Sequence, residues 1–484
     1  MKKHARLWQR LVVMAIATII LARFGVQISF AQDVSAPTME DFTSLKIAID
    51  TAWVMLTGFL VFFMQLGFAI LETGMIRQTA AVNALLENFL EAGIGAVSWW
   101  LIGFGLAFGV DNGSGLFGTT LFAPGIGLAD VIYYGNIGTL TMFFFQFAFA
   151  ATASTITTGA MAERTDFIGN LIYTVIVCAF IYPIVVHWVW GGGWLFQQGF
   201  FDFAGSNVVH TVGGVIALVG AWALGPRKGK VWGKAIPPHN LGLALTGTMI
   251  LWVGWYGFNP GSTLATVGAS GTVGIVVLNT TLGGGVGSLS ALLFQYIRTG
   301  KWDLTACLNG SLAGLVAITG GCAFVSPVAA IIIGAVAGIV LLLWGDLLER
   351  IKVDDAVGAS AVHLACGVWG ILAIGLFAEP SLTPFAGNVK AGLGGLLAGG
   401  DAQILITQII GSLATIIWCG VTSVIMFMAL KAIRRLRVNP AAEVDDNFID
   451  NYEHGQTVWP DILPLPGDAL PAESARATSP AVGD

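Results

Sequence analysis

The sequence predicts an all-α polytopic membrane protein whose chain crosses the bilayer eleven times. Of its 484 residues, 56% are hydrophobic and only 10% are charged, whereas soluble domains carry about 25% charged residues. The 64 glycines suit closely packed transmembrane helices. A short pattern, V-H-x-x-small-G-V, occurs twice in apolar segments, at 209–215 and 362–368. This composition excludes a soluble domain, and we expect no enzymatic activity, no cofactor or metal, and no nucleic-acid partner.

The first 31 residues have the features of a secretory signal peptide. A positively charged start precedes an apolar core at 11–21, and small residues, Ser29 and Ala31, stand at −3 and −1 of a cleavage site before Gln32. Cleavage there would leave the mature N-terminus outside the cell.

Eleven further apolar stretches are long enough to span a bilayer as helices, at about 20 residues each. They are 48–70, 90–110, 137–160, 168–190, 206–225, 239–258, 271–295, 305–323, 328–348, 357–378 and 402–430. Basic residues such as Arg77, Arg164 and Arg227 follow the odd-numbered stretches, and the opposite loops have few. The positive-inside rule therefore predicts an N-out, C-in, multi-pass protein of the cell (inner) membrane.

The odd number of spans and the paired motif predict two five-helix repeats of opposite orientation (5+5) followed by one extra helix. His210 would lie on the fifth span and His363 on the tenth. Inverted repeats bring such helices together near the middle of the bilayer, and intramembrane ionisable residues usually face the protein interior or a pore. The two histidines are therefore candidates for one shared site, although each could instead be satisfied by local hydrogen bonds.

The chain divides into a membrane domain at 45–438 and a cytoplasmic regulatory tail at 439–484. The stretch 445–464 mixes acidic residues with Tyr452, His454 and Trp459, a pattern more specific than that of a linker. The last twenty residues are rich in Ala and Pro, and we expect this end to be disordered.

Two span ends could line a polar cavity. The segment 187–194 reads H-W-V-W-G-G-G-W; an interfacial aromatic belt explains most of its tryptophans. The Gly run could let Trp190 approach a ligand, and an indole face can bind a cation.

The sixth span ends in Asn259-Pro260-Gly261-Ser262, where we expect the helix to break because Pro lacks an N–H and clashes with the preceding turn. Ser262 would then offer an oxygen, unless this is an ordinary helix end at the interface.

In their order and spacing, these motifs resemble the Amt ammonium transporters of the Amt/Mep/Rh superfamily. The matching segments are 187–193, 202–205, 209–210, 238–241, 257–262, and 353–355 followed by 362–363. The likeness covers the chain from about 45 to 438. It implies a homotrimer in the lipid bilayer with one pore in each subunit.

The resemblance also implies roles for single residues. The site that recruits ammonium would comprise Phe149, Trp190, Asp202 and Ser262. The gate beneath it would comprise Gln146, Phe149 and Phe258. His210 and His363 would line a hydrophobic pore. Ammonium would lose its proton at the outer aromatic site, and ammonia would cross the pore with net transfer of a proton or charge.

Two positions depart from the pattern of the family. Some relatives carry an Asp five residues before the second pore histidine; this chain has Gly358, so we expect no acidic residue symmetric with Asp202 at that place. Many relatives have Arg-x-Lys-Asn after the first span, where this chain has R-Q-T-A at 77–80. We interpret three glutamates near the same inner surface as structural or interfacial: Glu72, Glu87 and Glu91.

Other functions remain open at this point. The chain could be a Rh-like channel for ammonia or carbon dioxide, although Trp190 with Ser262 favours a transporter of the Amt type. It could be an ammonium sensor, although no kinase or cyclase pattern follows the membrane region. A membrane redox enzyme with the two pore histidines as haem ligands is a further alternative. The segment 449–455 resembles the ordered tail of Amt proteins, which suggests a PII-type signalling partner.

Overall fold

The computed structural model describes residues 37–126, 132–133, 137–444 and 447–460. The predicted signal peptide and the end of the tail lie outside these residues. The chain forms two compact units, 1–46 and 47–484. The described part of the first unit is the start of helix α2, and the rest of this description concerns the second.

Eleven apolar helical segments match the eleven predicted spans. Nine of those in the described residues are long enough to cross a membrane: α2 (Met39–Met75), Gln78–Phe108, α5 (Thr139–Met161), Phe167–Gln197, Ser206–Leu224, α10 (Leu241–Gly261), α11 (Ser270–Thr299), α13 (Pro327–Ile351) and α15 (Gln403–Ala432). Two shorter apolar segments complete the set: α12 (Leu304–Thr319) and Ala361–Phe377. The fold class is thus confirmed.

The second, fourth, fifth and tenth apolar segments contain 3₁₀ or π-helical turns beside their α-helices. The second segment comprises η1 (Gln78–Ala80), α3 (Ala81–Ser98), η2 (Trp99–Gly103) and α4 (Phe104–Phe108). The fourth comprises α6 (Phe167–Ile176), η3 (Val177–Ile181), α7 (Tyr182–Val189) and α8 (Trp194–Gln197). The fifth comprises η4 (Ser206–Thr211) and α9 (Val212–Leu224), and the tenth comprises η5 (Ala361–Ala365) and α14 (Cys366–Phe377).

The remaining elements are short and lie in loops or in the tail. They are η6 (Thr383–Ala386), η7 (Pro440–Ala442), η8 (Asp450–His454) and two antiparallel pairs, β1 (Ile132–Tyr133) with β2 (Ile137–Gly138) and β3 (Glu443–Val444) with β4 (Asn447–Phe448).

Two details of the predicted spans were wrong. The second span begins at Gln78 rather than at 90, which places Glu87 within it together with Glu91. Helix α10 runs through Pro260 instead of breaking before it. Pro260 lies in the last turn, so the N–H that it lacks removes one hydrogen bond at the helix end and interrupts no following turn. In the same turn the Ser262 hydroxyl donates to the Phe258 carbonyl at 2.8 Å.

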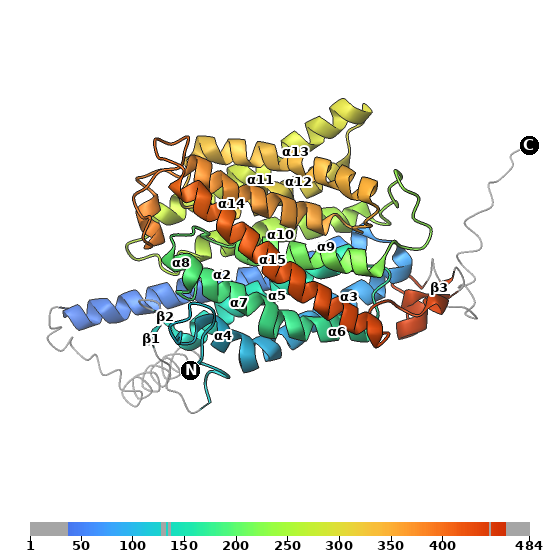
Figure 1. Ribbon diagram of the computed structural model, residues 1–484, viewed down its shortest axis with the longest axis horizontal. Coiled ribbons are helices and arrows are strands. Elements are labelled where there is room, and N and C mark those ends of the chain that lie inside the picture. Colours follow the sequence, from blue (N-terminus) through green and yellow to red (C-terminus); the bar gives the residue numbers. More distant parts are fainter. Residues whose placement is uncertain (1–36, 127–131, 134–136, 445–446, 461–484) are drawn as a thin grey trace, which may run out of the picture. The chain divides into compact units, whose positions relative to one another are not determined.

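The helix contacts repeat as two five-helix sets predict. In the first set α3 packs against α5 and α6, and α5 packs against α9; in the second, α11 packs against α12 and α13, and α12 packs against α14. Figure 1 shows α11, α12 and α13 in neighbouring positions. The two sets meet where η4 contacts η5 and α14, and α15 covers α9 and α14 as the extra helix.

The glycine that both copies of the repeated motif share makes this crossing possible. A Cβ added at Gly214 would lie 2.3 Å from the Leu364 nitrogen, and one added at Gly367 would lie 2.5 Å from the Ser206 carbonyl oxygen. Only glycine lets the two backbones approach so closely. The V-H-x-x-small-G-V pattern therefore combines a histidine with the glycine that packs its helix against the other repeat.

Buried ion pairs join the basic loops at the end of the bundle where the tail lies. Arg227 contacts Asp354 and Glu163, each at 2.9 Å, and Glu163 also pairs with Arg77. Burial acts to raise the pKa of Asp354, yet its bonds with Arg227 hold that pKa at about 2. These pairs gather the basic loops that follow different spans at one end of the bundle, which is the end expected in the cytoplasm.

Candidate functional site

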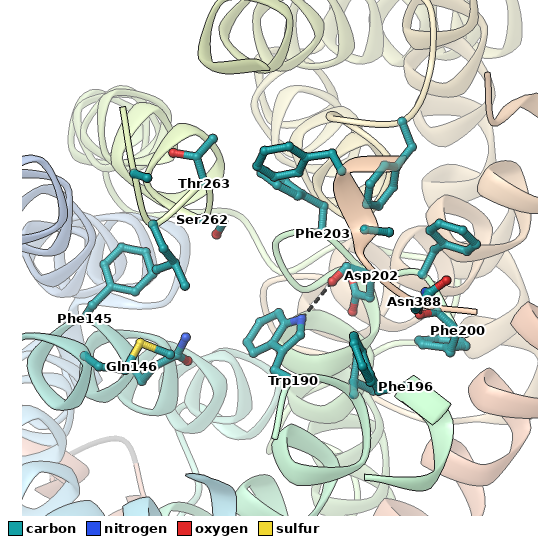
Figure 2. A pocket seen from close by; sticks show the side chains of 18 residues that line it. Phe145, Gln146, Trp190, Phe196, Phe200, Asp202, Phe203, Ser262, Thr263 and Asn388 are labelled. Atoms are coloured by element: carbon teal, nitrogen blue, oxygen red, sulfur yellow. Dashed lines mark hydrogen bonds between the residues drawn. The ribbon is translucent and has the colours of Figure 1, made fainter. Parts of the chain in front are cut away.

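A cavity of about 510 Å³ opens between α5, the loop that joins α8 to η4, and the end of α10. Figure 2 shows its lining side chains, which are mainly aromatic with a few polar groups. Among them are four residues that the sequence singled out: Gln146, Trp190, Asp202 and Ser262. We call this cavity the vestibule.

Trp190 follows the last turn of α7 and is fixed in orientation. Its indole N–H donates to the Asp202 carbonyl at 2.8 Å, as drawn in Figure 2. The glycines after it permit this position, since a Cβ at Gly191 would lie 2.1 Å from the Ala107 carbonyl oxygen. The ring is half-buried and therefore presents part of its face to the vestibule.

Ser262 and Gln146 line the vestibule opposite Trp190 (Figure 2). The Ser262 hydroxyl donates its hydrogen bond to the Phe258 carbonyl, so its oxygen lone pairs can accept a hydrogen bond from another donor. The Gln146 side-chain oxygen is buried without a partner among the described residues. The vestibule thus combines an indole face with two acceptor oxygens, a set suited to a small cation that carries N–H groups.

Asp202 is buried at the vestibule and holds the start of the fifth span. Its carboxylate accepts backbone N–H bonds from Gly205, Asn207 and Val208, each at 2.9 Å. Burial raises the pKa of Asp202 to about 6, although these three bonds act in the opposite direction. Asp202 therefore has a structural role at this helix end and is also an acidic group at the wall of the cavity.

Two stacked phenylalanines close the inner side of this site. The rings of Phe149 and Phe258 lie 4.1 Å apart at 29°, and both side chains are fully buried. Phe149 also meets Trp190 edge to face at 6.0 Å.

The two motif histidines meet directly below the phenylalanines. The Nδ1 atoms of His210 and His363 lie 3.1 Å apart, and both side chains are buried. The His210 ring contacts both Trp255 at 5.2 Å and Phe258 at 5.5 Å, and these two rings lie 5.7 Å from each other. At such a contact one Nδ1 must carry the proton and the other accept it. The residues therefore follow one another in the order vestibule, phenylalanine pair, His210 and His363.

The comparison of Asp202 with position 358 missed an acidic residue at an equivalent place before the second histidine. Position 358 is indeed glycine, but Asp355 lies eight residues before His363, as Asp202 lies eight before His210. Asp355 accepts backbone N–H bonds from Gly358, Ala359 and Ser360 at 2.8–3.1 Å. The equal spacing in the sequence was the signal that could have revealed this residue.

The three glutamates that we interpreted as structural or interfacial are all buried. Glu72, Glu87 and Glu91 are each exposed by 3% or less. Glu72 accepts from Thr158 at 2.7 Å and from Asn88 at 2.9 Å. It also lines a second, small cavity next to His363. The interfacial part of that interpretation is wrong, because these side chains lie inside the helix bundle.

Comparison with known proteins identifies the family. The model of the Ammonium Transporter Family matches residues 52–459. The chain belongs to this family. It is 39% identical to the ammonium transporter Amt2 of Archaeoglobus fulgidus over 86% of this chain and 90% of that protein, and 40% identical to a putative ammonium transporter of Synechocystis over 90% and 96%.

Solved structures agree with this ammonium transporter fold. The structure titled Sensor Amt Protein superposes with a TM-score of 0.77 at 36% identity, covering 85% of this chain and all of that one. Candida albicans Mep2 superposes with a TM-score of 0.72 at 29% identity, covering 83% and 90%. The protein is thus a multi-pass membrane transporter, not an enzyme, whose substrate is ammonium.

The tail of this ammonium transporter contacts the start of the second span. The Asp450 carboxylate accepts backbone N–H bonds from Val82 and Asn83, both at 2.8 Å. The His454 Nε2 lies 2.9 Å from the Asn83 side-chain oxygen, and its ring packs edge to face on Phe167. Asp450 therefore satisfies the free N–H groups at the beginning of α3.

Sequence reasoning about this ammonium transporter missed two aromatic neighbours of the site. Trp255 stacks on His210, and Phe145 packs against Phe149 with ring centroids 4.8 Å apart. Both lie one helical turn from a residue that the sequence did indicate, at 258 and at 149. Helical periodicity was the available signal, but apolar residues at this spacing also form ordinary cores.

Proposed function

We propose that this ammonium transporter recruits ammonium in the vestibule, removes its proton there, and conducts ammonia through a pore lined by His210 and His363. Charge crosses with the substrate because a proton is transferred as well. The contact between the two histidines, directly below the stacked phenylalanines, is the observation that carries this proposal.

Recruitment rests on the chemistry of the vestibule. The Trp190 face contributes about 0.5–2 kcal/mol to binding of a cation, depending on its desolvation, and the Ser262 oxygen accepts one N–H of ammonium. Asp202 adds negative potential when it is ionised. Ammonium and potassium are similar in size, but only ammonium can donate hydrogen bonds and lose a proton.

Selection is completed at the gate and in the pore. The Phe149 and Phe258 rings leave no polar group to replace the water shell of an ion, so they oppose the passage of charged species. A neutral ammonia molecule crosses this apolar layer more easily. Below it, the imidazole nitrogens supply hydrogen-bonding partners and a route for a proton.

We further propose that the functional protein is a homotrimer with its tail in the cytoplasm. The basic loops and the tail lie at one end of the bundle, in agreement with the positive-inside rule. The membrane domain would extend over 45–438 and the regulatory tail over 439–484, after removal of 1–31.

An ammonium sensor is the second candidate function. The solved structure titled Sensor Amt Protein is 36% identical to this chain and superposes well. A sensor would bind ammonium in the vestibule without sustained current. A Rh-like channel would conduct ammonia without charge. Net current in response to ammonium therefore separates the proposed transporter from both alternatives.

Replacing Trp190 with leucine tests the recruitment site. We expect the half-saturating ammonium concentration to rise by about 2-fold to 30-fold, which corresponds to loss of a contact of about 0.5–2 kcal/mol. Discrimination against potassium should weaken as well. Solid-supported-membrane currents with ammonium, methylammonium and potassium measure both quantities in wild type and variant. Trp194→Leu is the matched control, because Trp194 packs edge to face on Trp188 and does not line the vestibule. Unaltered affinity and selectivity in Trp190→Leu would show that Trp190 only serves the membrane interface.

Truncation of the tail at Asn439 tests its regulatory role. Because Asp450 and His454 hold the start of α3, we expect loss of the tail to change the maximum current and to abolish binding of a PII-type protein. Asp450→Ala in the full chain should reproduce the change in current, since it removes the acceptor for two backbone N–H groups at the start of α3. Current and partner binding equal to wild type in both variants would contradict a regulatory role of the tail.

A further inference from the structure

A small cavity lies next to His363, on the side away from His210. Its volume is about 20 Å³, and its polar lining comprises Glu72, Asn309 and His363 among apolar side chains. A cavity of about 10–15 Å³ is enough to hold one water, and ammonia is of similar size. It lies at the end of the bundle where α2 ends and the tail contacts α3. We call it the inner cavity.

Glu72 faces the inner cavity without a positive partner. It is 3% exposed and is held by the Thr158 hydroxyl and the Asn88 amide. The ion pairs of the described residues do not include it. A buried carboxyl group with neutral partners can gain or lose a proton without breaking an ion pair.

Unpartnered polar atoms beside Glu72 indicate that its surroundings accept a hydrogen-bond donor. The Asn88 side-chain oxygen belongs to the amide that donates to Glu72, and it is buried without a partner. The Glu87 Oε1 atom is also buried without one. Native structures rarely leave such atoms unsatisfied, so these two oxygens favour a hydrogen-bond donor next to Glu72.

The other acidic residues near the inner end cannot take this place. Asp355 is the symmetric counterpart of Asp202, but its carboxylate is occupied by three backbone N–H groups and it does not line the inner cavity. Glu91 accepts from Thr155 and Thr174 and does not line the cavity either. Glu72 is the carboxyl group that the cavity shares with His363.

We propose that Glu72 is an inner proton-exchange residue that reassembles ammonium after ammonia has crossed the pore. The proposal rests on the proposed function, because it needs both ammonia and a proton to arrive past His363. The ligand of the inner cavity is then ammonia on arrival and ammonium on release.

The exchange balances in three proton transfers. A proton from the outer side adds to the unprotonated ring nitrogen of His363 while the opposite ring N–H gives its proton to the Glu72 carboxylate, either directly or through one water that gains one proton and loses another. The carboxylic O–H then gives this proton to the lone pair of ammonia. The products are ammonium and the original carboxylate, and His363 is again a neutral imidazole.

Glu72→Gln tests the proposal, with Glu91→Gln as the matched control. Glutamine keeps the size and most hydrogen bonds but cannot carry the proton. We expect the maximum ammonium current of Glu72→Gln to fall at least tenfold while the half-saturating concentration stays within twofold, because the vestibule is remote. Glu72→Asp should recover part of the current, and Glu91→Gln should stay within twofold of wild type.

Two results would overturn the proposal: a maximum current within twofold of wild type in Glu72→Gln, or an equal loss in Glu91→Gln, which would indicate a structural role of the buried glutamates.

Gly159→Ala is a second test of the role of Glu72, for use if Glu72→Gln does not assemble. Its methyl group would enter the inner cavity 3.3 Å from the Glu72 Oε1 atom and 2.7 Å from a Val357 methyl. The expected result is a similar loss of current, and wild-type current would overturn the proposal.

The experiments distinguish a failure of the Glu72 proposal from a failure of the proposed histidine pore. Normal current in Glu72→Gln leaves the histidine mechanism standing and removes only the inner acid. Normal current in a variant that lacks both histidines removes the mechanism on which Glu72 depends.

Discussion

Replacing His210 and His363 together by alanine is expected to reduce the ammonium-driven current at least tenfold. Both imidazoles are buried, and their Nδ1 atoms lie 3.1 Å apart. Without them the polar contact that links the phenylalanine pair to the inner cavity is lost, and with it the proposed carrier of the proton. Current recorded from folded, trimeric variants in liposomes measures the effect.

Acidic replacements at the same positions should change selectivity rather than only the size of the current. Aspartate or glutamate in place of His363 offers only acceptor oxygens when ionised. Such a group attracts a cation directly, so we expect weaker discrimination against potassium. If the histidines were only packing residues, selectivity would remain unchanged in whatever current persists.

His239→Ala is the matched control for the histidine variants. His239 precedes α10, is only partly buried, and contacts the Ile76 carbonyl at 2.9 Å. Loss of this histidine should leave ammonium selectivity intact. Wild-type current and selectivity in the double alanine variant would end the twin-histidine mechanism for this chain.

Asp202→Asn is expected to raise the half-saturating ammonium concentration about tenfold or more, equivalent to about 1.4 kcal/mol. The substitution removes the negative charge at the vestibule wall while keeping one oxygen for the backbone N–H groups. Asp202→Ala should also destabilise the protein, because three buried N–H groups lose their acceptor at about 1–3 kcal/mol each. Thermal unfolding and current titrations separate the two effects.

The pH dependence follows from the raised pKa of Asp202. Burial places this pKa at about 6, above the ordinary value of 3.8, so Asp202 loses its charge as the outer pH falls through about 6. Ammonium affinity should therefore decline below this pH in wild type, and this decline should be absent in Asp202→Asn.

Asp355→Asn is the internal control for Asp202. Asp355 holds the start of the tenth span in the same way, but it does not line the vestibule. A loss of thermal stability in both variants with a loss of ammonium affinity only in Asp202→Asn is the expected pattern. Equal affinity in the two variants would show that Asp202 serves only as a helix cap.

The sequence by itself predicted the membrane class, the eleven spans, their grouping as five plus five plus one, and the pair of histidines. These features depend on local quantities. Transfer of an apolar segment into lipid has a free energy that sums over its own residues, and a duplicated motif is visible without knowing where its copies lie. The resemblance of the motifs to the Amt family then supplied the family and its substrate, which the comparisons confirm.

Only the tertiary structure decided which side chains meet. Asp355 and Glu72 are ordinary acidic residues in the sequence. In the structure Asp355 caps the start of the tenth span, as Asp202 caps the fifth, and Glu72 faces a cavity beside His363. The sequence around Pro260 predicts a helix break before this residue, but α10 includes Pro260 in its last turn. The close crossing at Gly214 and Gly367 sets the distance between the histidines. Such contacts join residues far apart in the chain, and their free energy depends on long-range packing that no local pattern encodes.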